Sequence, residues 1–114
     1  MNKVLLHLSE TRRRAVEPDD IFWVEAVGHD TLVRLRGSTR LRDTRKLAEL
    51  LRMLEPHGFV RVHDNHGVNP NHVFEIRKRS RGQDWEVKLE PPVNGVVLVS
   101  RSRIASLWRA YDET

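Results

Sequence analysis

The segment Ile21-Phe-Trp-Val-Glu-Ala-Val27 carries the strongest strand signal in the chain. It concentrates aromatic and β-branched residues, which suit the pleated surface of a sheet. Apolar side chains occupy both alternating sets of positions, so both faces of this strand are expected to be buried. Residues 17–20, a proline and three acidic residues, interrupt pairing before it, and residues 28–30 form a turn after it. We therefore expect residues 21–27 to be the central strand of a sheet.

Shorter apolar or alternating segments lie on both sides of this strand, and most of them are separated by turns. The other expected strands are residues 3–8, 14–16, 31–36, 39–42, a strand that begins at Phe59, and residues 73–79, 85–89 and 96–99. Short connections favour antiparallel pairing, whereas a parallel βαβ sheet would need more helices than this chain offers. The predicted fold is mainly β (α+β minor), with small antiparallel sheets of about ten short strands and two short helices.

Two segments change to the helical period, with apolar residues at i, i+3, i+4 and i+7. The stripes are Leu47, Leu50, Leu51 and Leu54 in the first segment and Ile104, Leu107, Trp108 and Tyr111 in the second. Such stripes predict amphipathic helices that pack on a core. Asp43 or Thr44 is expected to cap the first helix, and Ser100 or Ser102 the second.

Composition limits the classes of protein that remain. A chain of 114 residues suits a single domain, residues 1–114. The absence of cysteine excludes disulfides and thiolate zinc sites. No apolar run approaches the ~20 residues of a membrane span, and the N-terminal run is too short for a signal peptide. We expect a soluble, cytoplasmic protein without a membrane partner. The net charge is +4 and 16 of the 20 basic residues are arginine, a bias that favours nucleic acid as partner.

Polar side chains gather in Phe59-Val-Arg-Val-His-Asp-Asn-His-Gly-Val-Asn69, a segment that begins as a strand. Its hydrogen-bonding residues include Arg61, His63, Asp64 and Asn65. A second polar corner, with Arg101 and Arg103, follows the last strand and precedes the last helix. Arginine and asparagine side chains can read base edges in the major groove, and both corners would form one recognition edge if they lie at the same end of the scaffold.

Enzymatic alternatives fit the same residues less well, and no catalytic residue, metal or cofactor is expected. Four histidines, His57, His63, His66 and His72, have spacings that match no closed structural zinc pattern. A His-metal nuclease would need a metal ligand on a following helix, where this chain has Pro70 leading into a strand. No Gly-x-Ser-x-Gly elbow supports a nucleophilic serine.

The order and spacing of several motifs resemble the LytTR family of bacterial DNA-binding domains. The motifs are Ile21-Phe-Trp-Val-Glu-Ala, Phe59-Val-Arg-Val-His63, Val68-Asn69 and Val99-Ser-Arg101, and the resemblance spans residues 3–111. It implies a transcription factor that binds short direct repeats in double-stranded DNA by inserting loops into successive major grooves. Members usually carry a receiver or other sensory module, so the resemblance also implies a separate or deleted module of that kind.

The resemblance assigns roles by position. His63 and its neighbours match the first DNA-contacting loop, and Arg101 matches the second. The turn after the central strand matches a further contact, which would fall to His29 or Thr31. Asn69 matches an asparagine that we expect to be structural.

Asp64 departs from the family pattern, which has a basic residue at this position. A carboxylate near phosphates is repulsive unless it accepts a hydrogen bond from a cytosine amino group or orients an arginine. Asp64 is therefore expected to change sequence preference, to hold Arg61 or Arg101, or to weaken DNA affinity. The alternative function is a protein-interaction module that has kept the fold and lost DNA binding.

Overall fold

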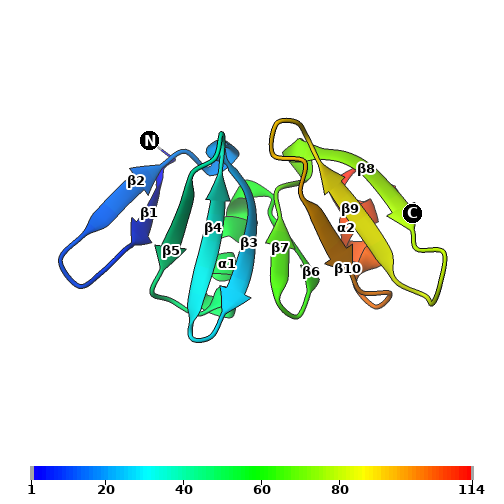
Figure 1. Ribbon diagram of the computed structural model, residues 1–114, viewed down its shortest axis with the longest axis horizontal. Coiled ribbons are helices and arrows are strands. Elements are labelled where there is room, and N and C mark those ends of the chain that lie inside the picture. Colours follow the sequence, from blue (N-terminus) through cyan, green and yellow to red (C-terminus); the bar gives the residue numbers. More distant parts are fainter. Residues whose placement is uncertain (1, 114) are drawn as a thin grey trace.

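The computed structural model describes residues 2–113 and contains ten strands, two α-helices and three short 3-10 turns in this part of the chain. A five-stranded sheet lies in the middle in the order β5–β4–β3–β7–β6 (Figure 1). Its strands are β3 (Ile21–Val27), β4 (Asp30–Leu35), β5 (Arg40–Asp43), β6 (Val60–His63) and β7 (His66–Val68). All its pairs are antiparallel, and β3 is the middle strand, as predicted.

Two smaller antiparallel sheets flank this one in Figure 1. One is the hairpin of β1 (Val4–His7) and β2 (Arg13–Val16). The other has three strands, β8 (Val73–Lys78), β9 (Trp85–Leu89) and β10 (Val96–Val99), in the order β10–β9–β8. The mainly β architecture of small antiparallel sheets is thus confirmed.

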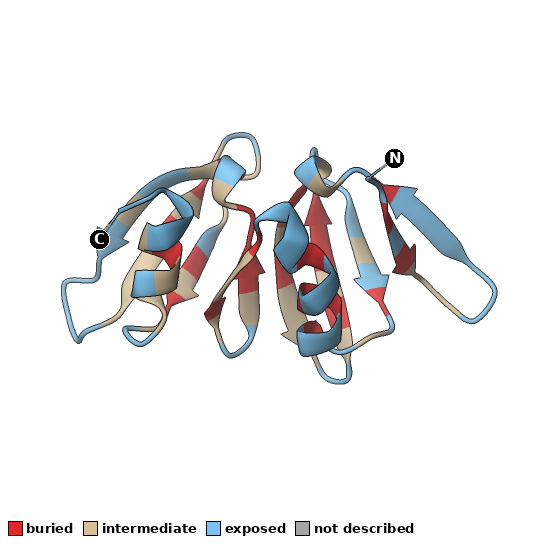
Figure 2. Cartoon of the chain, turned by 180° about the vertical axis from the view of Figure 1, so that it is seen from behind, coloured by how far each residue is buried: buried red, intermediate tan, exposed pale blue. Residues whose placement is uncertain are grey.

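Both α-helices lie on the same side of the sheets (Figure 2). Helix α1 (Leu47–Leu54) buries all four leucines of its predicted stripe. Helix α2 (Ile104–Ala110) buries Leu107, whereas Tyr111 follows the helix and is 40% exposed. Within residues 2–113, no helix is long and apolar enough to span a membrane.

The central strand β3 contributes to both hydrophobic cores, and the register shift between Ile21 and Trp23 allows Phe22 and Val24 to join different cores although they are two residues apart. Val24 belongs to the core formed with α1 and the β1–β2 hairpin. Phe22 belongs to the core formed with the three-stranded sheet and α2. Both faces of residues 21–27 therefore pack on a core, as predicted, and β3 lies between the two packed halves of the domain.

The predicted helix caps are wrong. Lys46 is the N-cap of α1 and Arg103 that of α2, and neither makes a side-chain capping bond. Asp43 is instead fully buried and accepts hydrogen bonds from the backbone N–H of His7 and from Arg45. The Ser100 hydroxyl donates to the carbonyl of Val62 on β6. Both side chains join strands rather than helix ends.

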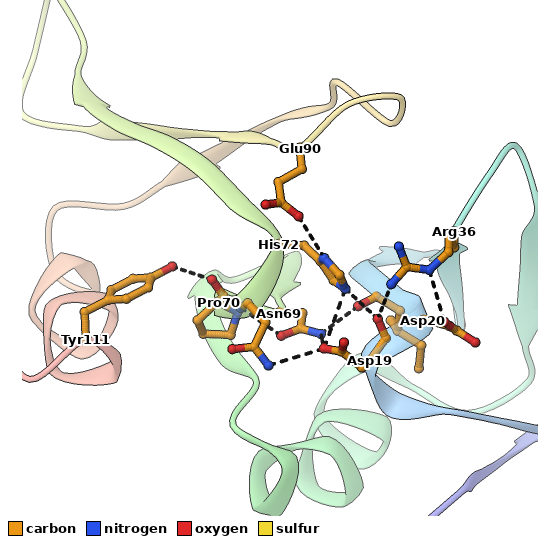
Figure 3. Close-up of polar contacts among 10 residues, drawn as sticks. Asp19, Asp20, Arg36, Asn69, Pro70, His72, Glu90 and Tyr111 are labelled. Carbon is orange, nitrogen blue, oxygen red and sulfur yellow. Dashed lines mark hydrogen bonds and ion pairs between the residues drawn. The ribbon is translucent and has the colours of Figure 1, made fainter.

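A buried polar junction connects the two halves at the upper edge of Figure 1 (Figure 3). The ring of His72 stacks on Phe22 with 4.0 Å between centroids. One ring nitrogen of His72 contacts Glu90 Oε1 at 3.1 Å, and the other contacts the carbonyl of Asp19. Asn69 is also buried, and its side-chain amide donates to the carbonyl of Ile21 at 3.0 Å, a structural role of the kind expected for it.

Candidate nucleic-acid interface

Six turns lie along one edge of the molecule, opposite the His72 junction, which we call the lower edge after its place in Figure 1. They are residues 8–12, 28–29, 44–46, 64–65, 79–84 and 100–103. The strands run up and down between the two edges, so alternate connections return to the same one. This is why polar segments far apart in the sequence meet there.

The segment after Phe59 forms a tight hairpin rather than one strand with a polar end. Residues 64 and 65 form its turn between β6 and β7. The Arg61 guanidinium donates to the carbonyls of Asp64 at 2.6 Å and His63 at 3.4 Å. Arg61 therefore holds the inside of the turn, and its cation still adds positive charge to this edge.

His63 has a defined orientation in this turn. Its Nδ1 accepts a hydrogen bond from the backbone N–H of Asn65 at 3.2 Å. In the neutral ring the proton is then assigned to Nε2, which makes Nε2 a donor. The Asn65 side chain is exposed and makes no hydrogen bond within residues 2–113. The turn thus offers an imidazole donor and an amide with both donor and acceptor groups.

The corner before α2 lies directly beside this turn, which meets the condition under which the sequence predicts one recognition edge. Arg103 Nη2 is 3.1 Å from Asp64 Oδ1. The backbone N–H of Ser100 also donates to the Val62 carbonyl of β6 at 2.9 Å. Asp64 therefore holds an arginine, but the arginine is Arg103 rather than Arg61 or Arg101.

Arg101 is the exposed cation of this corner. Its backbone N–H donates to Asp84 Oδ1 at 3.2 Å, which fixes the main chain, while its guanidinium makes no ion pair or hydrogen bond within the described residues. A fixed backbone with a free guanidinium suits bidentate contact with a guanine edge or a phosphate. Asp84 and Ser100 have no local sequence signal that marks them as anchors, because their partners lie 17 and 38 residues away along the chain.

The two DNA contacts predicted for the turn after β3 differ in their exposure. His29 is exposed at the tip. Thr31 is fully buried, and its hydroxyl donates to the carbonyl of Arg45 at 2.8 Å. The pleat of β4 turns Thr31 inward, so we correct the sequence prediction and omit Thr31 from the interface. The turn is tied to its neighbour, because the N–H of Ala26 donates to the carbonyl of Asn65 at 2.9 Å.

The histidines do not converge. His63 and His66 are neighbours, with ring centroids 5.7 Å apart, and His66 contacts Glu25 at 3.0 Å. His72 lies in the buried junction at the opposite edge. Among residues 2–113, no three metal-ligating side chains come together.

Buried and exposed charges are separated along the lower edge. Burial alone would raise the pKa of Asp43. The hydrogen bonds that its carboxylate accepts from the Arg45 side chain and from the N–H groups of His7 and Arg45 outweigh this effect, and they hold the pKa below its usual value. Asp43 therefore neutralises Arg45, which is 10% exposed. Among the described residues, the arginines at positions 12, 79, 81 and 101 have no carboxylate partner.

A family model described as the LytTr DNA-binding domain matches residues 11–112. The chain belongs to the LytTR family of DNA-binding domains. A similar solved structure is described as the LytTr DNA-binding domain of a methyl-accepting/DNA response regulator from Bacillus cereus, with 20% identity, a TM-score of 0.75 and 96% of each chain covered. At that identity the likeness concerns the fold. No curated protein matches the chain.

The LytTR membership confirms the resemblance seen in the sequence, including the mainly β fold. In this LytTR domain, the two polar corners that carry the resemblance are joined by the Asp64–Arg103 ion pair.

Proposed function

We propose that residues 1–114 act as one domain that binds double-stranded DNA sequence-specifically in bacterial transcription regulation. The turns at residues 28–29, 64–65 and 100–103 enter successive major grooves at short direct repeats, and a receiver or other sensory module controls the domain. The observation that carries this proposal is that exposed turns with hydrogen-bonding side chains lie next to one another along one basic edge. The family of the chain supports the same partner.

The exposed side chains divide into two kinds. His63, Asn65 and Arg101 present free donors or acceptors, which suit base edges: an arginine fork for guanine and an amide for adenine. His29 is the corresponding side chain on the turn after β3. Arg61 supports the loop from inside and places its cation near phosphates.

Asp64 and Arg103 act as a pair in this proposal. Asp64 is exposed (83% of its side chain), so it repels phosphates in part, and its ion pair aims the Arg103 guanidinium across the two corners. The carboxylate accordingly tunes the edge by restraining an arginine. The residual negative charge is the observation that favours the second candidate, an interaction module without DNA binding.

In-vitro selection from a random DNA pool tests the proposal directly. We expect enrichment of paired short direct repeats, with affinity that falls steeply with salt as counterions are released. Arg101→Ala should weaken binding to the selected site by about 1–3 kcal/mol, or roughly 5- to 150-fold. Absence of enrichment, together with no DNA binding by Asp64→Arg, would favour the interaction module.

A further inference from the structure

The lower edge extends beyond the three turns assigned to base contacts and ends in two arginine-bearing hairpins. Arg12 lies in the β1–β2 turn, and Arg13 begins β2 opposite His7. Arg79 and Arg81 lie in the β8–β9 turn. All four arginines are exposed and have no ion pair or side-chain hydrogen bond within residues 2–113. Figure 1 shows these two turns at opposite ends of the lower edge.

The length of the molecule places these hairpins beyond a single groove. The longest dimension is 45 Å, which corresponds to about 13 base pairs of B-DNA at ~3.4 Å per pair. One helical turn is only ~34–36 Å. A duplex lying along the lower edge would therefore pass the base-contacting turns in its middle and meet the two hairpins outside them.

We propose that the β1–β2 and β8–β9 hairpins are two DNA-backbone clamps, with Arg12 and Arg13 on one and Arg79 and Arg81 on the other contacting phosphates that flank the recognised bases. This inference rests on the proposed function. These arginines lie outside the turns that we assign to base contacts, so they are placed to reach the phosphates on either side of the recognised bases. Phosphates need a cation within reach, so these hairpins contribute affinity and footprint length rather than sequence preference.

Each clamp is attached to the body of the domain close to its turn. Arg45 donates to the carbonyl of Leu5 at 2.9 Å, and the N–H of Thr44 donates to the carbonyl of His7 at 2.9 Å, which hold β1 beside β5. The β8–β9 hairpin is held through Asp84, which accepts from the N–H of Arg101 at 3.2 Å. The second clamp therefore shares an anchor with a base-contacting corner.

The test compares double variants that each remove two charges. The variants are Arg12→Ala with Arg13→Ala, and Arg79→Ala with Arg81→Ala. Affinity is measured on a selected duplex of about 30 base pairs, more than twice the ~13 that the edge covers, and on an unrelated duplex, at several salt concentrations. We expect each variant to lose similar affinity on both duplexes and to reduce the slope of log K against log salt by about one to two. Hydroxyl-radical footprints should shorten at one end in each case.

The matched control is Arg40→Ala with Arg52→Ala, which removes the same charge from the start of β5 and the outer side of α1. Its slope should stay close to that of the wild type. Equal slopes in the clamp and control variants would overturn the clamps while leaving DNA binding intact. Wild-type protein that enriches no sequence and shows no salt dependence would overturn the proposed function itself.

Lysine substitutions separate the charge from the arginine fork. With Arg12→Lys and Arg13→Lys the salt slope should remain at the wild-type value, because a phosphate needs only the cation. A slope reduced as far as in the alanine variants would show that these positions do more than supply charge, and would also contradict the proposal.

Discussion

Asp43→Asn is expected to destabilise the fold far more than its small chemical change suggests. The Asp43 carboxylate is fully buried. It accepts from the N–H of His7 at 2.9 Å, from the N–H of Arg45 at 2.8 Å, and from the Arg45 guanidinium at 2.9 and 2.7 Å. The amide keeps the shape of the side chain, but it loses the charge and one of the two acceptor oxygens.

The size of this loss of stability follows from Arg45, which is left without its partner. Arg45 is 10% exposed and would keep its charge without a counterion. Removing one partner of a buried ion pair costs about 3–5 kcal/mol. We expect about 3 kcal/mol for Asp43→Asn, the lower end of that range, because the remaining amide oxygen still accepts a hydrogen bond. The total free energy of unfolding of a domain is roughly 5–15 kcal/mol, so a loss of this size should be easily measured.

Urea unfolding of the variant, followed by tryptophan fluorescence, measures this loss. Asp20→Asn is the matched control, because it makes the same change in the Asp20–Arg36 ion pair, where the aspartate side chain is 48% exposed. Exposed pairs contribute only about 0–1 kcal/mol. If both variants lose the same free energy of unfolding, burial is not what makes the Asp43 cluster stabilising.

The pH dependence of the same comparison has a defined sign. The pKa of Asp43 is lowered in the folded protein, since its hydrogen bonds outweigh the desolvation that alone would raise it. The contribution of the carboxylate is therefore complete above its unfolded-state value of 3.8 and is lost as the pH falls through the lower folded value. The difference between wild type and Asp43→Asn should accordingly shrink only below about pH 4.

Three further predictions concern single positions. Asp64→Asn should raise affinity for DNA roughly 3- to 10-fold at low salt and steepen the salt slope by about one, since it removes an exposed carboxylate and releases Arg103; weaker binding would mean that the carboxylate itself takes part in recognition. Burial, with a smaller effect from a nearby carboxylate, raises the pKa of Tyr111 to about 12, so ultraviolet titration of the folded protein should show a midpoint near 12 and stability should begin to fall above about pH 10. In Gly95→Ala the new Cβ would lie 2.6 Å from Cζ3 of Trp23, and urea unfolding should show a loss of about 1–3 kcal/mol from overpacking; an unchanged midpoint would show that the indole moves freely.

The sequence predicts the fold well where the signal is local. Residues 21–27 are apolar on both faces, and they form the middle strand that both cores share. The leucine stripe of residues 47–54 has the period of a helix and is buried throughout. In both cases the pattern is repeated within a few residues, so neighbouring side chains alone determine which face is apolar.

The sequence predicts less where the decisive partner lies far along the chain. Aspartate is a residue type that commonly caps helices, yet the carboxylate of Asp43 accepts a hydrogen bond from the backbone N–H of His7, 36 residues away. His29 and Thr31 are two residues apart and both polar, but His29 lies at the exposed tip of the turn, whereas Thr31 lies within β4 and is buried. The LytTR motifs locate the two polar corners, but they do not indicate that Arg103 is the partner of Asp64.

The distribution of carboxylates explains how a chain with a net charge of only +4 can present a basic edge. The carboxylates of Asp19 and Glu90 lie in the upper junction, 3.6 and 3.1 Å from the ring nitrogens of His72. Asp43 is buried and neutralises Arg45 internally. The negative charge of these three side chains is thus placed away from the exposed tips of the lower turns, where several arginines have no carboxylate partner among the described residues. Asp64 is an exposed carboxylate between the two polar corners, and this position makes it a residue through which mutation can directly adjust the DNA affinity that we propose.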